Sequence, residues 1–183
     1  GIALSPDENT LYVTTGVPEG ILHVVSVQEQ TILDSVTVGY GACSPVVRPD
    51  GERVYVCNRY ENDVSVVDVN KRKELVRIAV GREPRAAEIT RDGNLLFVAN
   101  HLPSQPANQA TVRSSIHVIH TGGLQKVGEI LLPNGSTCLE DICVSNDGEY
   151  LFVTHVLARF HMPTTQLERG WMNTNAVSIL SAE

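Results

Sequence analysis

The side chains best suited to chemistry gather near one end of the chain, between two segments that resemble β-strands. They occupy the loop 155–175 and are His155, Arg159, His161, Gln166, Arg169, Trp171 and Asn173. Arg and Trp anchor many protein interfaces, and Arg also pairs with carboxylates or phosphates. Because compact domains rarely contain so long a loop without a function, we expect these residues to bind a ligand or a protein partner. The alternative is a loop that packs only on its own scaffold, with Trp171 as its small core.

His101 is a further candidate for this binding surface, because it follows "FVAN" at the place where His155 completes "FVTH". Together with His161 these residues could ligate a metal or haem, since neutral imidazole is a common ligand. No carboxylate or Cys stands at a supporting spacing. We therefore expect the histidines to hydrogen-bond loop backbone, and we expect no metal site.

No catalytic residues are expected. The sequence contains no G-x-S-x-G, no CxxC and no CxxCH, and its cysteines are Cys43, Cys57, Cys138 and Cys143. Folding of the hairpin around "PDG" should bring Cys43 close to Cys57, as a disulfide or as two free buried thiols. A hydrolase-like site with a central metal is a weaker possibility, for which Glu88, Glu140 and Asp141 are the carboxylates to consider.

Bulk properties exclude two classes of partner. The formal net charge is −7, the isoelectric point is about 5.3 and 42% of residues are hydrophobic. Nucleic acid binding needs a basic face, which this composition does not supply. A membrane span needs 18 or more apolar residues in a row, which the sequence lacks. No export signal is visible in the opening residues "GIALSPDEN".

A repeat positions these residues. Four segments look alike, namely "SPDENTLYVTT", "RPDGERVYVCN", "TRDGNLLFVAN" and "SNDGEYLFVTH", and their Asp residues are spaced by 43, 42 and 55 positions. Short apolar runs repeating near 42 residues indicate β-propeller blades of four strands. Runs such as "VSVVDV" are apolar on both faces, which favours blades packed between blades over a two-sheet sandwich. The predicted blades are 1–39, 40–81, 82–133 and 134–183.

The second unit has the fullest pattern: Pro45, "PDG" (49–51), "YVCN" (55–58), "VSVVD" (64–68) and "IAVG" (78–81). It resembles the YVTN-type β-propeller repeat. The resemblance implies an all-β fold and a bacterial or archaeal protein that is exported to the periplasm or cell surface. Such propellers usually have seven blades. We therefore expect about four blades and 15 strands of a larger ring, with a closed four-bladed ring or a ring completed by a second copy as alternatives.

Antiparallel strands place alternate loops on opposite faces of a blade. The loops 100–114 and 155–175 should share one face with the crossovers between blades, whereas the Asp turns should lie on the other. Asp50, Asp92 and Asp147 are expected to accept backbone hydrogen bonds in these turns and to have no catalytic role.

These observations predict a non-catalytic binding or scaffold module of an exported bacterial protein. It would recognise a protein partner, a ligand or a neighbouring domain through the face carrying loops 100–114 and 155–175. No cofactor is expected, and haem or a metal would enter only through a domain outside this segment. The alternative is the propeller portion of a redox enzyme with a fused or partnered cytochrome or di-haem peroxidase-like domain.

Overall fold

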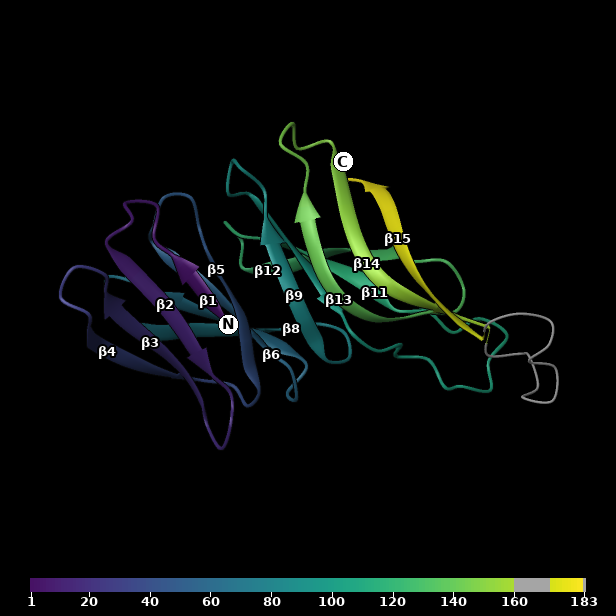
Figure 1. Ribbon diagram of the computed structural model, residues 1–183, viewed down its shortest axis with the longest axis horizontal. Coiled ribbons are helices and arrows are strands. Elements are labelled where there is room, and N and C mark those ends of the chain that lie inside the picture. Colours follow the sequence, from purple (N-terminus) through teal and green to yellow (C-terminus); the bar gives the residue numbers. More distant parts are fainter. Residues whose placement is uncertain (160–171, 183) are drawn as a thin grey trace.

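The computed structural model describes residues 1–159 and 172–182, which form 15 strands and no helix (Figure 1). The first sheet contains β1 (Ile2–Leu4), β2 (Thr10–Thr15), β3 (Gly20–Ser26) and β4 (Thr31–Val38). The second contains β5 (Ala42–Val47), β6 (Arg53–Asn58), β7 (Asp63–Asp68) and β8 (Lys73–Ala79). The third contains β9 (Pro84–Ile89), β10 (Leu95–Asn100), β11 (Ser115–His120) and β12 (Gln125–Leu131). The fourth contains β13 (Ser136–Val144), β14 (Tyr150–Ala158) and β15 (Asn173–Ser181).

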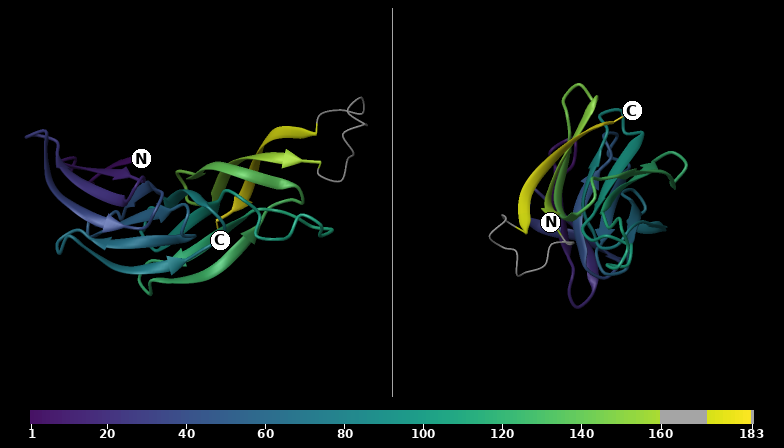
Figure 2. Two further views of the ribbon diagram at one scale, coloured as in Figure 1. Left: turned by 90° about the horizontal axis from the view of Figure 1, so that it is seen from below. Right: turned by 90° about the vertical axis from the view of Figure 1, so that its right-hand side faces the viewer.

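Each sheet is a simple antiparallel meander in chain order, four-stranded in the first three and three-stranded in the fourth. The first strands β1, β5, β9 and β13 contact their counterparts in the neighbouring sheets, which makes them the inner strands. Figure 2 shows the first and fourth sheets at opposite ends of an elongated molecule. This arrangement is that of successive propeller blades, so the predicted architecture and strand number are confirmed.

Three hydrophobic clusters hold the blades together, one at each seam between neighbouring sheets. At the first seam Tyr12, Leu22 and Val24 pack against Val54 and Val56 of the second blade. Side chains on both faces of the central strands are buried, as the apolar pattern on both faces predicted. Burial of apolar area at about 25 cal/mol per Å² is the main force that stabilises each seam.

The Asp turns behave as the sequence predicts. Asp92 accepts hydrogen bonds from the Thr90 hydroxyl at 2.5 Å and the Asn94 backbone N–H at 3.0 Å. These bonds, the Thr90 bond most, hold the pKa of Asp92 below its usual value. Asp50 and Asp147 each accept the backbone N–H two residues on, at 3.0 and 3.1 Å.

The hairpin of the fourth blade differs from expectation. We expected the loop to begin at His155, but β14 and β15 continue to pair through Ala158 and Asn173. His155 is therefore a strand residue opposite Ala176. Polar residues such as Asn175 and Thr174 made this part of the strand look like a loop in the sequence. A strand at the edge of a sheet tolerates polar side chains that a buried strand does not. Within the described residues, no helix is long and apolar enough to cross a membrane.

Candidate functional site

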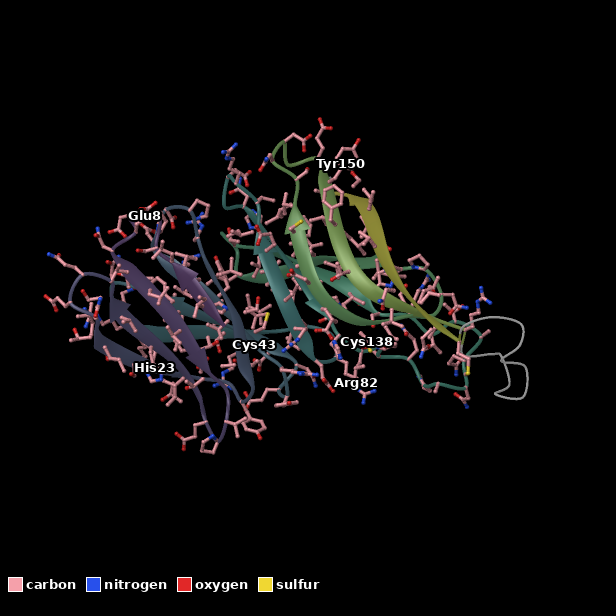
Figure 3. The ribbon with its side chains drawn as sticks, in the orientation of Figure 1. Glu8, His23, Cys43, Arg82, Cys138 and Tyr150 are labelled. Atoms are coloured by element: carbon pink, nitrogen blue, oxygen red, sulfur yellow. The ribbon has the colours of Figure 1, made fainter. Side chains whose placement is uncertain are left out.

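Polar side chains meet where the inner strands β9 and β13 begin, at the end of the blades that carries the crossovers. We call Arg85, His101 and Glu140 the inner-strand cluster. Arg85 Nε lies 3.3 Å from Glu140 Oε2, and His101 Nδ1 lies 3.5 Å from Glu140 Oε1. In Figure 3 the labelled Cys43 and Cys138 lie near the starts of β5 and β13, the inner strands on either side of β9. The cluster thus joins the third blade to the fourth.

Hydrogen bonding determines which nitrogen of His101 carries the proton. Nδ1 lies 3.0 Å from the carbonyl oxygen of Leu139, which can only accept, so Nδ1 is the donor. In the neutral ring Nε2 then has a free lone pair, and among the described residues no hydrogen-bond partner occupies it. A carbonyl or carboxylate on the far nitrogen is the usual support of a metal-ligating imidazole. His101, whose side chain is 12% exposed, can therefore act as a ligand or a base.

His155 has less capacity for either role. Its Nε2 is 2.9 Å from the Ser178 hydroxyl and its Nδ1 is 3.2 Å from the carbonyl oxygen of Val156, so both ring nitrogens have partners. The side chain is buried but lines a pocket of about 430 Å³ formed by all three strands of the fourth blade. Glu140 lines the same pocket and contacts His101, so both predicted histidines lie near one carboxylate.

The other predicted binding residues do not join this cluster. Arg159 is exposed and its backbone N–H donates to the carbonyl of Met172 at 2.7 Å, beside the exposed Asn173. His161, Gln166, Arg169 and Trp171 lie outside the described residues. The loop 100–114 is tied to the next crossover, because Asn134 accepts from the Val112 N–H at 2.9 Å and donates to Ala110 O at 3.2 Å.

The cysteines do not form an activated nucleophile in the described residues. Cys43 and Cys57 face each other across β5 and β6, as predicted, and both are free thiols. The Cys43 thiol donates to the carbonyls of Pro84 and Arg85 at 3.7 and 3.8 Å. Burial raises the pKa of Cys43 and raises that of Cys57 well above its usual value, so neither is a thiolate near neutral pH.

Glu88 and Asp141 lie on the neighbouring inner strands β9 and β13. Burial, and to a smaller extent the charge of Asp141, raises the pKa of Glu88. No group of three or more His, Cys, Asp or Glu that could hold a metal occurs within residues 1–159 and 172–182. The weaker hypothesis of a hydrolase with a central metal therefore gains no support from these carboxylates.

Sequence reasoning did not identify the pairing of Arg85 with Glu140, which are 55 positions apart. Each stands at the irregularity in the pairing of an inner strand with its second strand, in "REPR" and "CLED". That equivalent position is the signal that could have found them. It was masked by a bulge in β13, where three residues separate Thr137 from Asp141 in the pairing with β14.

Comparison with known proteins adds an independent finding. A sequence model of the family described as "Cytochrome D1 heme domain" matches residues 6–126. No curated protein matches. Among solved structures, Kuenenia stuttgartiensis hydrazine synthase is 24% identical over 100% of this chain and 62% of that chain, with a TM-score of 0.60. A functionally unknown protein from Desulfotomaculum acetoxidans DSM 771 is 18% identical over 85% of this chain and 49% of its own, with a TM-score of 0.68.

The two structures support the propeller fold, and this chain spans less than two thirds of either of them. The family match contradicts the prediction of a non-catalytic binding or scaffold module and favours the redox alternative. The prediction was wrong because blade-forming residues dominate the pattern of a propeller, whereas function depends on a few residues that do not repeat. The YVTN-type resemblance is not among the matches and stays a prediction.

Proposed function

This chain belongs to the cytochrome D1 heme domain family, and on that premise we propose that it is the propeller portion of a redox enzyme. The observation that carries the proposal is the family match over residues 6–126. These residues include the first blade from β2 onward, the second blade and most of the third, with Arg85 and His101 of the inner-strand cluster. The activity of the whole protein and its location in the periplasm or at the cell surface belong to the proposal.

The inner-strand cluster fits one side of a haem site. The porphyrin supplies four ligands to its iron, so the protein needs to add only one or two axial ligands. His101 meets that requirement, because the Leu139 carbonyl at 3.0 Å keeps the proton on Nδ1 and leaves Nε2 available. Arg85 has a partly exposed guanidinium beside the starts of β9 and β13, where it can pair with a haem carboxylate.

Each residue of the cluster then has a distinct task. His101 would bind the group through Nε2, and Arg85 would hold one of its carboxylates. Glu140 contacts both His101 and Arg85, so it positions the two side chains relative to each other. When bound, haem would supply the centre for one-electron transfer. A fused or partnered cytochrome domain would exchange electrons with it, as the alternative from the sequence proposed.

The test is a haem titration of the purified chain followed by visible absorption. We expect a shifted Soret band that saturates at one haem per chain. His101→Ala should abolish the shift, and Arg85→Ala should weaken binding on the order of tenfold, as expected for a lost charge-assisted pair. His23→Ala is the matched control, since His23 lies on β3 of the first blade and bonds Ser35 at 2.8 Å, and it should bind normally.

Absence of a shift in the wild-type chain would contradict the assignment of haem to these residues. Unchanged binding by His101→Ala, with a native circular dichroism spectrum, would contradict the role of that ligand.

A further inference from the structure

Cys43 and Cys57 have the placement that a disulfide requires. They are direct partners in the antiparallel pairing of β5 and β6. Residues opposite each other in such a pair have Cα atoms about 4.5–5.5 Å apart, and a disulfide joins Cα atoms about 4.4–6.8 Å apart. Both thiols pack in the hydrophobic cluster between the second and third blades, so they project from the same face of the sheet. The two residues can therefore be bridged without a large movement of the backbone.

The same place in the third blade is occupied by two alanines. Ala86 faces Ala99 across β9 and β10, and both side chains are buried. A seam between blades therefore packs well with a methyl group at each of these positions. The need to fill space does not account for two thiols in the second blade, so a chemical role for them is worth seeking.

The position of Arg85 depends on a β-bulge close to these thiols. The pairing of β9 with β10 skips Arg85, which lies as an extra residue between Pro84 and Ala86. A bulge changes the direction of the side chain on its extra residue. Here Arg85 Nε comes to lie 3.3 Å from Glu140, which places the guanidinium in the inner-strand cluster. The shape of this bulge therefore determines where Arg85 is presented.

The first residues of β5 hold this bulge in place. The Cys43 thiol donates to the carbonyl oxygens of Pro84 and Arg85 at 3.7 and 3.8 Å. The hydroxyl of the next residue, Ser44, accepts the backbone N–H of Ala87 at 3.1 Å. The thiol hydrogen of Cys43 is thus shared between the two carbonyls that form the bulge. A reaction that removes this hydrogen also removes a contact that holds Arg85.

We propose that Cys43 and Cys57 form a reversible disulfide, and that only their reduced form fully holds the bulge that presents Arg85. Oxidation removes the S–H hydrogen of both cysteines, so the carbonyls of Pro84 and Arg85 lose their donor. The Cys43 sulfur is then bonded to Cys57 instead. The disulfide and its effect on the bulge stand independently of the proposed redox function, whereas the consequence for haem rests on it.

The oxidant belongs to the class of small-molecule or protein disulfides. The Cys43 thiolate attacks one sulfur of the oxidant, forms a mixed disulfide and releases the first thiolate. The Cys57 thiolate then attacks the Cys43 sulfur, closes the internal disulfide and releases the second thiolate. The two cysteines lose two electrons and two protons in total, and the oxidant takes up both to become two thiols.

The surroundings of the two sulfurs give the order of these steps. Cys43 is half-buried, whereas Cys57 is buried, so an external disulfide meets Cys43 first. Burial raises the pKa of Cys43, but the charges of Arg85 and Arg59 oppose this rise. Burial raises the pKa of Cys57 well above its usual value, and the charge of Cys43 raises it further. Cys43 is therefore the attacking thiol, and Cys57 is the thiol that resolves the mixed disulfide.

The first test identifies the bond. The purified chain is incubated with oxidised glutathione, digested without reduction and analysed by mass spectrometry. We expect the peptides of Cys43 and Cys57 to be linked, with their combined mass lower by two hydrogen atoms, and dithiothreitol should separate them. Cys57→Ala should stop at glutathione bound to Cys43. Cys143→Ala is the matched control, because Cys143 is an exposed thiol on β13, and it should form the bond normally.

Two results would overturn the disulfide. One is the absence of a link between Cys43 and Cys57 in the wild type while its circular dichroism spectrum is native. The other is a link from Cys43 to a different cysteine. Because alanine already occupies the position equivalent to Cys57 in the third blade, Cys57→Ala should fold, and its result can be interpreted.

The second test measures the bulge without haem. Amide hydrogen exchange of residues 85–87, followed by nuclear magnetic resonance, should be about two- to tenfold faster in the oxidised chain than in the reduced chain, as expected for the loss of one hydrogen bond. Dithiothreitol should restore the slower rate. Exchange of residues 64–67 on β7 should not change. Equal exchange of residues 85–87 in the two forms would overturn the coupling between the disulfide and the bulge.

The third test connects the disulfide to the proposed function. Haem titration should show about two- to tenfold weaker binding by the oxidised chain, because Arg85 is held less firmly. Equal affinities of the two forms would overturn the link to haem. If the reduced chain itself gives no Soret shift, the proposed function fails, and the mass and exchange measurements still decide whether the disulfide forms and controls the bulge.

Discussion

His101 and His155 occupy matching places in consecutive repeats, yet their hydrogen bonds give them different chemistry. His101 donates from Nδ1 to a carbonyl and keeps Nε2 available. His155 uses Nε2 toward Ser178 and Nδ1 toward Val156. We predicted that these histidines would hydrogen-bond only to loop backbone. For His155 this holds in part, because one of its two partners is a backbone carbonyl and the other is a side-chain hydroxyl. The ligand hypothesis now concerns His101, which we propose as the residue that would hold haem.

His117 allows a prediction about pH. Its side chain is 7% exposed on β11, and Nε2 lies 3.4 Å from Glu129. Burial, aided by the charge of Lys126, lowers the pKa of His117 below its usual 6.5, and Glu129 opposes this only in part. The unfolded chain therefore takes up the proton more readily. Stability should fall as the pH decreases through about 6.5 toward the lower pKa of the folded state.

The measurement is urea unfolding of the wild type and of His117→Gln at pH 7.5 and pH 5.5. We expect the loss of unfolding free energy between these pH values to be larger in the wild type, because Gln does not titrate. His120→Gln, at an exposed position on the same strand, is the control and should retain the wild-type loss. Equal losses in the wild type and His117→Gln would contradict this account.

At the scale of elements, the repeat contains a steric pairing between a glycine and an asparagine. A Cβ on Gly39 would lie 2.3 Å from Cγ of Asn58, and a Cβ on Gly81 would lie 2.6 Å from Cγ of Asn100. The glycine after each fourth strand therefore makes room for the buried Asn that ends the next blade's second strand. In the fourth blade His155 replaces the Asn, and Pro133 stands at the place of the glycine.

Gly81→Ala should destabilise the protein by about 1–3 kcal/mol, because the new methyl group displaces the buried Asn100. The Asn100 amide donates to the carbonyl of Ser115 at 2.9 Å, and that bond would be lost. Gly128→Ala is the matched control. Its Cβ would meet only Val118 at 3.7 Å, an ordinary contact, so thermal unfolding should show no loss. A similar effect of the two substitutions would refute the steric explanation.

At the scale of the whole molecule, the seams determine where a side chain contributes to stability. Phe97 and Phe152 occupy equivalent positions on β10 and β14, and Phe97 packs in the hydrophobic cluster between the third and fourth blades. Phe97 is 1% exposed there, whereas Phe152 is partly exposed. A phenylalanine at this position is therefore buried in the third blade and partly exposed in the fourth.

Phe97→Ala should cost about 3–5 kcal/mol of unfolding free energy, the usual range for a buried aromatic residue. Phe152→Ala should cost clearly less when both variants are measured by chemical denaturation, because the Phe152 side chain is only partly buried. An equal cost would contradict the difference in burial between the two positions.

The sequence alone determined the blades. Each blade buries both faces, so apolar runs, Asp turns and spacing recur, and the 15 strands, the turn roles of Asp50, Asp92 and Asp147 and the facing of Cys43 and Cys57 could be predicted from them. These features depend on contacts within one repeat. Because the same contacts recur in every repeat, the residues that make them recur periodically in the sequence.

Only the tertiary structure decided which chemistry comes together. Arg85 lies on β9, His101 follows β10 and Glu140 lies on β13, and they meet because the third and fourth blades pack with a particular offset. No periodicity encodes that offset. The family match overturned the non-catalytic prediction for a related reason, since the repeat that dominates the sequence carries the scaffold. The different burial of Phe97 and Phe152 likewise emerged only from the tertiary structure, because a residue's type is the same whether or not another blade covers it.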